Sequence, residues 1–376
     1  MGPKLLGPFC LSFGAIINFK ILDMGKKELV DFGGNGLGRQ FFWILSLVLV
    51  GFLAGWLAKG WMRGMGARIT YDNPPLRVED PKYKLISPLY ACGSLGEERY
   101  QEFDGLRSKI ANEVKSAISK GSVSSASVYF RDLGRGRWVA INDEAKYFPA
   151  SLLKVPLMIT YFKQEDDDPG FLDRTLVYDG SFDDFGKQYI PPAESIEKGE
   201  AYTLDELVRR MIVYSDNKAV RVLVKYIDSS FLAHVYDDLG LKFLNETNDL
   251  DAVTVRDYSY FFRVLYNGTY LSKQLSEKAL EILTQADFPK GIRSGVAPGV
   301  KVAEKFGQGV FNESSGDQET IELHDCGIVY GPGTNYLLCV MTKGNNTNDL
   351  TKAIGDISGV VFKVVSSFDY ANLRVD

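Results

Sequence analysis

The sequence has few of the residues that bind metal ions or form catalytic triads. Its 376 residues include two histidines and four cysteines: His234, His324, Cys10, Cys92, Cys326 and Cys339. Two histidines leave little room for a zinc site or a Ser-His-Asp triad, and the cysteines lack the spacing of metal ligands. The G-x-S-x-G turn of α/β-hydrolases is also missing. We therefore expect no metal ion and no cofactor.

The sequence also lacks a long basic run. Its formal net charge is −5, whereas phosphate binding needs clustered lysines and arginines. A nucleic-acid partner is therefore not expected. With 45% apolar and 24% charged residues the composition is that of a globular protein. The length favours one large domain with an N-terminal attachment.

One apolar run, residues 41–58, has the length of a membrane span. It contains 18 residues without a charge, which form a helix of about 27 Å. A buried helix of a soluble protein is the alternative interpretation. Five basic residues precede the run and three follow it, which favours a cytoplasmic N-terminus.

The run is not followed by a small-residue cleavage site or a lipid-accepting cysteine, which favours an uncleaved signal anchor. The sequence thus predicts a cytoplasmic segment 1–40, a transmembrane anchor 41–61, a linker 62–82 and a globular domain 83–376, with the bilayer as a partner of residues 41–58. Met24 is an alternative translation start.

The globular part alternates between helix and strand patterns. An amphipathic helix is expected first, then a β-hairpin, a group of helices, three strands and a closing helix. The expected helices span residues 97–120, 254–267, 272–286 and 349–368, and the expected strands span residues 127–133, 138–142, 301–309, 320–330 and 335–342. Thr203 and Glu206 form a capping box that opens a further helix.

The stretch at residues 147–160, YFPASLLKVPLMIT, combines a polar pair with an apolar surrounding. Ser151 follows Pro149 and lies three residues before Lys154, so hydroxyl and amine share one face of a helix. Burial among hydrocarbon disfavours the ammonium form, and a neutral amine can accept the serine proton. A second S-x-x-K, at residues 195–198, lacks the apolar face that would bury its lysine.

Two later tripeptides complete a known pattern. Ser215-Asp216-Asn217 and Lys305-Phe306-Gly307 follow S-x-x-K in the order typical of class A β-lactamases and penicillin-binding proteins. Between residues 83 and 368 the chain therefore resembles the class A β-lactamase-like serine hydrolases. The resemblance implies an α/β (α+β) fold, in which an antiparallel sheet is flanked by helices and the site lies in a cleft beside an all-helical lobe.

The resemblance also implies roles for the motif residues. Ser151 would be the nucleophile and Lys154 its base, while Ser215 relays the proton to the leaving nitrogen. A helix cap is the alternative role for Ser215, and Asp216 is expected to be structural. Substrate binding is expected at Asn217, Gly307 and Gln308, with the Asn217 amide on the amide side chain of the substrate, and the Lys305 amine would hold a substrate carboxylate. The backbone N–H groups of Ser151 and Gln308 would form the oxyanion hole.

Several positions depart from the family pattern. Phe306 replaces a hydroxyl residue, and Cys326 falls where class A enzymes often have an arginine. The E-x-x-L-N deacylation motif is missing from residues 241–253, where Glu246 is the candidate acid and a solvated turn the alternative. Residues 182–199 are expected to form a loop, in which Tyr189 or Ile190 would wall the site, and a plain surface loop is the alternative interpretation.

Cys326 and Cys339 are equally distant from an expected turn at residues 331–334. The hairpin therefore places them opposite each other. A cross-strand disulfide and two reduced, buried cysteines are both compatible with this pattern.

Three functions fit the pattern. The first is a membrane-anchored, extracytoplasmic hydrolase of the bacterial cell envelope, with a monomeric catalytic domain, that opens β-lactams through an acyl-enzyme on Ser151. The second is a D,D-peptidase or cell-wall acyltransferase that acts on peptidoglycan peptide and is only inhibited by β-lactams. The third is a sensor domain without catalysis.

Overall fold

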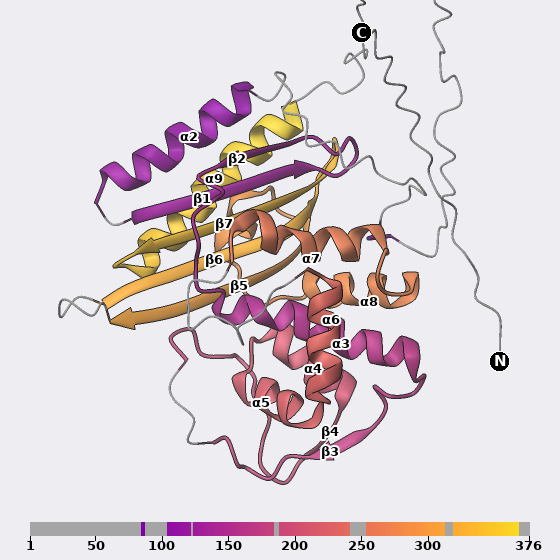
Figure 1. Cartoon of the computed structure of the whole chain (residues 1–376). Coiled ribbons are helices and arrows are strands. Elements are labelled where there is room, and N and C mark those ends of the chain that lie inside the picture. Colours follow the sequence, from indigo (N-terminus) through magenta and orange to yellow (C-terminus); the bar gives the residue numbers. More distant parts are fainter. Residues whose placement is uncertain are drawn as a thin grey trace, which may run out of the picture. The chain divides into compact units, whose positions relative to one another are not determined.

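The computed structural model describes residues 84–86, 104–121, 123–183, 188–240, 253–312 and 319–367. Its centre is a five-stranded sheet with the order β2-β1-β7-β6-β5, in which all neighbouring strands are antiparallel (Figure 1). The strands are β1 (Val123–Asp132), β2 (Trp138–Ile141), β5 (Lys301–Asn312), β6 (Glu319–Tyr330) and β7 (Asn335–Gly344). The expected strands are therefore confirmed, although β1 begins four residues earlier than expected and β5 and β7 run slightly further than the patterns indicated.

Two long helices cover one face of the sheet, α2 (Asp104–Ser119) and α9 (Thr347–Ser367) (Figure 1). The apolar stripe of α2 faces the sheet, where Leu106, Ile110 and Val114 are buried. Ile118, near the end of the helix, is 40% exposed instead. This face follows from the helical spacing of apolar residues.

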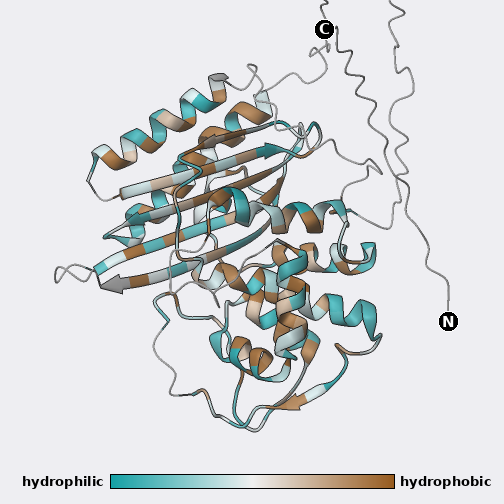
Figure 2. Ribbon diagram, in the orientation of Figure 1, coloured by the Kyte–Doolittle hydropathy of each residue, from teal (hydrophilic) through white to brown (hydrophobic). Residues whose placement is uncertain are grey.

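The other face carries a helical lobe. Its elements are the 3₁₀ turn η2 (Ala150–Leu153), α3 (Lys154–Asp167), α4 (Leu204–Val213), α5 (Asn217–Tyr226), α6 (Ser229–Asp238), α7 (Val255–Asn267) and α8 (Lys273–Thr284), with the 3₁₀ turn η3 (Gly291–Gly295) leading back to the sheet. Figure 2 shows apolar residues on the inner sides of these helices. The fold is the α+β arrangement that the resemblance implied.

Local chemistry sets the helix starts. Thr203 caps α4 by accepting a hydrogen bond from the Glu206 N–H at 3.1 Å, as the capping box predicts. Asp216 caps α5 in the same way, at 2.9 Å from the Lys218 N–H. A short hairpin of β3 (Thr175–Val177) and β4 (Ala201–Thr203), which the sequence patterns did not predict, precedes α4.

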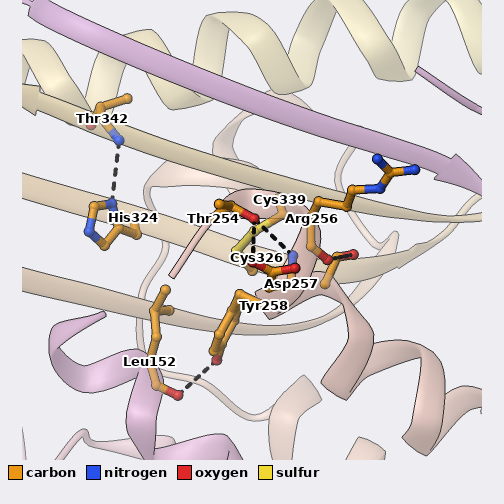
Figure 3. Close-up of a disulfide and its surroundings, with 10 residues drawn as sticks. Leu152, Thr254, Arg256, Asp257, Tyr258, His324, Cys326, Cys339 and Thr342 are labelled. Carbon is orange, nitrogen blue, oxygen red and sulfur yellow. Dashed lines mark hydrogen bonds between the residues drawn. A yellow bond between two sulfur atoms is a disulfide. The ribbon is translucent and has the colours of Figure 1, made fainter. Parts of the chain in front are cut away.

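The turn between β6 and β7 sets the register of both strands. Tyr330 pairs with Asn335, and Cys326 therefore lies opposite Cys339. The structure joins these two buried cysteines by a disulfide beneath α7 (Figure 3). Of the two alternatives that the sequence allows, the structure has the disulfide.

Some predictions fall outside the described residues. These are the segments 1–40, 41–61 and 62–82, with the apolar run 41–58, and the candidate acid Glu246. Among the residues that the structure does describe, no helix combines the length and the apolar character of a membrane span.

Candidate active site

The three motifs meet where the sheet and the helical lobe join. Ser151 lies in η2, and Lys154 is the first residue of α3. Ser215 lies in the turn between α4 and α5, and Lys305 lies on β5, which is an edge strand of the sheet. Four separate elements therefore bring the predicted site residues to one place.

Lys154 is the buried centre of this arrangement. Its Nζ lies 2.8 Å from Ser215 Oγ, 2.6 Å from the Ser215 carbonyl oxygen and 2.8 Å from Asn217 Oδ1. The side chain is 4% exposed. The amine thus reaches both polar residues of the second motif.

Lys305 approaches the same hydroxyl from the sheet. Its Nζ lies 3.1 Å from Ser215 Oγ and 2.9 Å from the Phe306 carbonyl oxygen, and it is fully buried. Ser215 Oγ is therefore within hydrogen-bond distance of two lysine amines. A hydroxyl in this position can pass a proton between them, because it can accept and donate at the same time.

Burial acts on the charge of both lysines. Desolvation lowers the pKa of Lys154 well below its usual value, the charge of Lys305 lowers it further, and Asp216 opposes the change. Desolvation also lowers the pKa of Lys305, to about 7, against the opposing charges of Asp325 and Glu304. A neutral Lys154 is the form that can accept a proton from a serine.

Ser215 has an unusual backbone. Its φ is 57°, in the left-handed region that costs a residue with a side chain about 1–2 kcal/mol. Its carbonyl oxygen accepts hydrogen bonds from Lys154 at 2.6 Å and from Gln188 Nε2 at 3.0 Å. Hydrogen bonds such as these stabilise a residue in a strained backbone conformation.

Gln188 was not predicted to belong to the site. Besides its bond to the Ser215 carbonyl, its Oε1 accepts a hydrogen bond from the Asn217 N–H at 3.2 Å. The Gln188 amide is therefore hydrogen-bonded to both the first and the last residue of the second motif. The next residue, Tyr189, is 63% exposed, and Ile190 packs on the core beside the sheet, so neither is shown to wall the site.

Asp216 has the structural role that the sequence predicted. Its carboxylate accepts hydrogen bonds from Ser195 Oγ at 3.0 Å and from the Ile196 N–H at 2.9 Å, in addition to capping α5. It fixes the loop at residues 195–196 to the second motif. The second S-x-x-K, which begins at Ser195, therefore serves as an anchor for the motif and not as a nucleophile with its base.

A buried charged group lies beside Lys305. Arg293 Nε lies 2.7 Å from Glu304 Oε1, and Asp325 Oδ2 accepts the Ile292 N–H at 2.8 Å. Burial raises the pKa of Asp325 to about 7 and the pKa of Glu304 well above its usual value, and the charge of Asp325 raises the pKa of Glu304 further. The charges of these two acids raise the pKa of Lys305 and so oppose the larger effect of desolvation.

Phe306 occupies the position of the missing hydroxyl. Its ring stacks on Phe288 at 4.2 Å between centroids, and Lys305 Nζ lies 4.0 Å from the centre of the same ring. A cation over an aromatic face is attracted to it. The ring is 4% exposed, so it supports the lysine from inside the protein.

Gly307 and Gln308 place β5 against the serine turn. A Cβ at position 307 would lie 3.0 Å from both the Leu152 nitrogen and the Pro149 oxygen. Only glycine allows this approach without displacement. Gln308 donates from Nε2 to Thr347 Oγ1 at 3.0 Å. The half-buried Ser151 therefore lies beside the strand that carries Lys305.

Replacing Gly307 by alanine is expected to lower the free energy of unfolding by about 1–3 kcal/mol, the usual cost of overpacking. The new methyl group must push the backbone of the serine turn away from β5. Urea denaturation measures the change. The matched control is Gly105→Ala in α2, where a Cβ meets nothing within 4 Å and a helix gains stability from alanine. Equal stability of the Gly307→Ala variant and the wild type would contradict the close approach.

Metal ligation has no support in the part of the chain that the structure describes. No group of three or more histidine, cysteine, aspartate or glutamate side chains there is arranged to hold a metal ion. The motifs instead supply two serine hydroxyl groups, two amines and an amide, a set suited to proton transfer and to binding of an anion.

Comparison with known proteins agrees with this geometry. Residues 106–365 match the model of the beta-lactamase enzyme family, and the chain belongs to this family. It is therefore a hydrolase of the serine β-lactamase and penicillin-binding-protein type, as the motifs implied. No curated protein matches the chain.

Solved structures show the same fold. A β-lactamase from Sphaerobacter thermophilus is 20% identical, with a TM-score of 0.57 over 70% of this chain and 98% of that chain. A class A β-lactamase from Bacteroides cellulosilyticus is 18% identical, with a TM-score of 0.59 over 70% of this chain and 99% of that chain. PBP-A is 20% identical, with a TM-score of 0.57 over 70% of this chain and 97% of that chain.

Proposed function

We propose that the chain is a class A-type active-site serine hydrolase that forms an acyl-enzyme with β-lactams through Ser151. The observation that carries the proposal is the position of Ser215 Oγ, 2.8 Å from Lys154 Nζ and 3.1 Å from Lys305 Nζ. Ser215 Oγ thus connects Lys154, the proposed base for Ser151, to Lys305, the proposed cation that binds the substrate. A PBP-A mutant, whose fold is similar, has been solved as an acyl-enzyme complex with penicillin G.

The reaction follows from these contacts. Neutral Lys154 takes the proton of the Ser151 hydroxyl as Oγ attacks the amide carbonyl carbon. The backbone N–H groups of Ser151 and Gln308 stabilise the oxyanion that forms. The C–N bond then breaks, and the departing nitrogen receives the proton from Lys154 through Ser215. The product is an ester of Ser151, which water hydrolyses in a second step.

Lys305 and Asn217 bind the substrate in this proposal. The Lys305 amine, beside the relay hydroxyl, pairs with a carboxylate of the substrate, and the Asn217 amide bonds to its amide side chain. Both residues already contact the proton relay, directly or through Lys154. Substrate binding and proton transfer are thus performed by one hydrogen-bonded group.

Intact-protein mass spectrometry tests the acylation step. The full chain is incubated with penicillin G, and we expect a mass increase of one penicillin molecule that is lost in the Ser151→Ala variant. A label that survives this substitution would refute the proposal. No label and no turnover at high enzyme concentration would also refute it, and would favour a sensor domain.

A second candidate differs in the fate of the acyl-enzyme. The missing E-x-x-L-N motif in residues 241–253 favours a D,D-peptidase or acyltransferase, in which β-lactams acylate Ser151 and leave slowly. The time course of the same experiment separates the two. A mass increase that decays within seconds supports a β-lactamase, whereas one that persists for minutes supports the second candidate.

A further inference from the structure

The residue before the nucleophile has a strained backbone. Ala150 has a φ of 47°, in the left-handed region, although it carries a Cβ. Such conformations persist where the surrounding structure determines them, and they are concentrated at functional sites. Contacts on both sides of Ala150 must therefore hold it.

On its C-terminal side a side-chain hydrogen bond from α7 holds the turn. Tyr258 donates from its buried hydroxyl to the Leu152 carbonyl oxygen at 2.8 Å (Figure 3). The Leu152 N–H bonds in turn to the Pro149 oxygen at 2.9 Å, which closes the turn around Ser151. This end of the turn is fixed to α7.

On the N-terminal side two buried side chains hold Phe148 by its backbone. Glu322 Oε2 accepts a hydrogen bond from the Phe148 N–H at 2.9 Å, and His324 Nε2 lies 3.0 Å from the Phe148 carbonyl oxygen. Both come from β6, where Glu322 is 2% exposed and His324 is fully buried. Phe148 lies three residues before Ser151.

The two side chains are themselves fixed. His324 Nδ1 accepts the Thr342 N–H at 3.3 Å (Figure 3), so its proton lies on Nε2, which donates to Phe148. Glu322 Oε1 lies 2.8 Å from Lys343 Nζ. Burial raises the pKa of Glu322, but the hydrogen bonds from His324 and Lys343 outweigh this and leave the pKa lowered, so the carboxylate is charged.

We infer that Glu322 and His324 are positioning residues for the nucleophile. They hold the Phe148 backbone, and with it the left-handed Ala150, so that Ser151 keeps its place beside Lys154 and β5. The inference rests on the proposed function of Ser151. It adds residues that lie outside the three motifs and have no contact with Lys154, Ser215 or Lys305 among the described hydrogen bonds.

Acylation kinetics of the full chain with a fluorescent penicillin test the inference. His324→Met removes the donor to Phe148, and we expect the acylation rate constant to fall at least about tenfold, since small misplacements of reacting groups are costly. The dissociation constant of the non-covalent complex should change less than about twofold, because Lys305 and Asn217 are on other elements. His324→Gln retains an N–H donor and should recover most of the rate.

Glu277 provides a matched control. It is also a buried carboxylate that holds backbone N–H groups, those of Lys84, Leu85 and Ile86 at 2.6–2.9 Å. Glu277→Gln is expected to lower stability but to leave the acylation rate constant unchanged. A His324→Met variant that acylates at the wild-type rate would overturn the inference.

Hydrogen exchange gives a readout without catalysis. The peptide covering residues 147–153 should exchange faster in His324→Met than in the wild type and in Glu277→Gln. If His324→Met does not fold, Glu322→Gln serves instead, with an expected rate loss of about threefold to tenfold. Absence of acylation in the wild type would refute the proposed function, whereas unchanged exchange of this peptide would refute the positioning role.

Discussion

Replacing Lys154 by methionine is expected to slow acylation of Ser151 by about a hundredfold to ten-thousandfold, the usual contribution of a general base. The variant keeps an unbranched side chain that is one atom shorter, and it removes the amine that contacts Ser215 and Asn217. The rate constant is measured from single-turnover labelling with a fluorescent penicillin. Folding should be preserved, because methionine fills the buried site without the desolvation penalty of an amine.

The control for this prediction lies on the same helix. Lys163, in α3, pairs with Asp167 at 2.9 Å on the surface, and Lys163→Met should acylate at the wild-type rate. A Lys154→Met variant that is folded by circular dichroism and still labels rapidly would show that another group removes the serine proton.

The second large effect concerns Lys305 and pH. Its pKa of about 7 means that the amine loses its charge as pH rises through neutrality. Substrates with a carboxylate should therefore be acylated less efficiently above pH 7, and Lys305→Ala should lose roughly a hundredfold in efficiency towards them, since a lost charge partner costs about 3 kcal/mol. The measurement is the ratio of the acylation rate constant to the dissociation constant as a function of pH. The fall of this ratio at alkaline pH reports the pKa of Lys305 in the free enzyme.

The two lysines make activity depend on pH in opposite directions. Lys154 must be neutral to act, so activity falls as pH drops through its lowered pKa. Lys305 must be charged to bind, so activity falls as pH rises through its own pKa. A bell-shaped profile is expected, and Asp325→Asn should move the alkaline limb to lower pH, because Asp325 raises the pKa of Lys305.

A methyl ester of the same penicillin is the matched control. It lacks the carboxylate, so its alkaline limb should be absent, although its acylation is slower throughout. An ester whose efficiency falls above pH 7 as steeply as that of the acid would mean that Lys305 acts on the proton relay and not on the carboxylate.

The motifs were predictable because their chemistry depends on spacing along the chain. Ser151 and Lys154 are three residues apart on one turn, and the capping box at Thr203 marks the helix that leads to Ser215. Alternating apolar residues and a Gly-Pro-Gly turn located the strands that carry Lys305 and the two cysteines. Local rules were sufficient for these positions.

Gln188, Glu322 and His324 were not predictable in the same way. Each acts on backbone groups far away in the sequence, and a side chain that binds a peptide group has no fixed partner type. His324 was noted only because histidine is rare here, and it was not assigned to a site. The Arg293–Glu304 pair was missed for the same reason, since nothing in the sequence indicates that η3 returns to β5.

The place of β5 at the border of the sheet has a further consequence. A border strand exposes unpaired peptide groups, which other chains can join to build aggregates. Here the turn that carries Ser151 packs against this strand at Gly307. An extended peptide that added to this edge as a further strand would therefore run alongside the turn that holds Ser151.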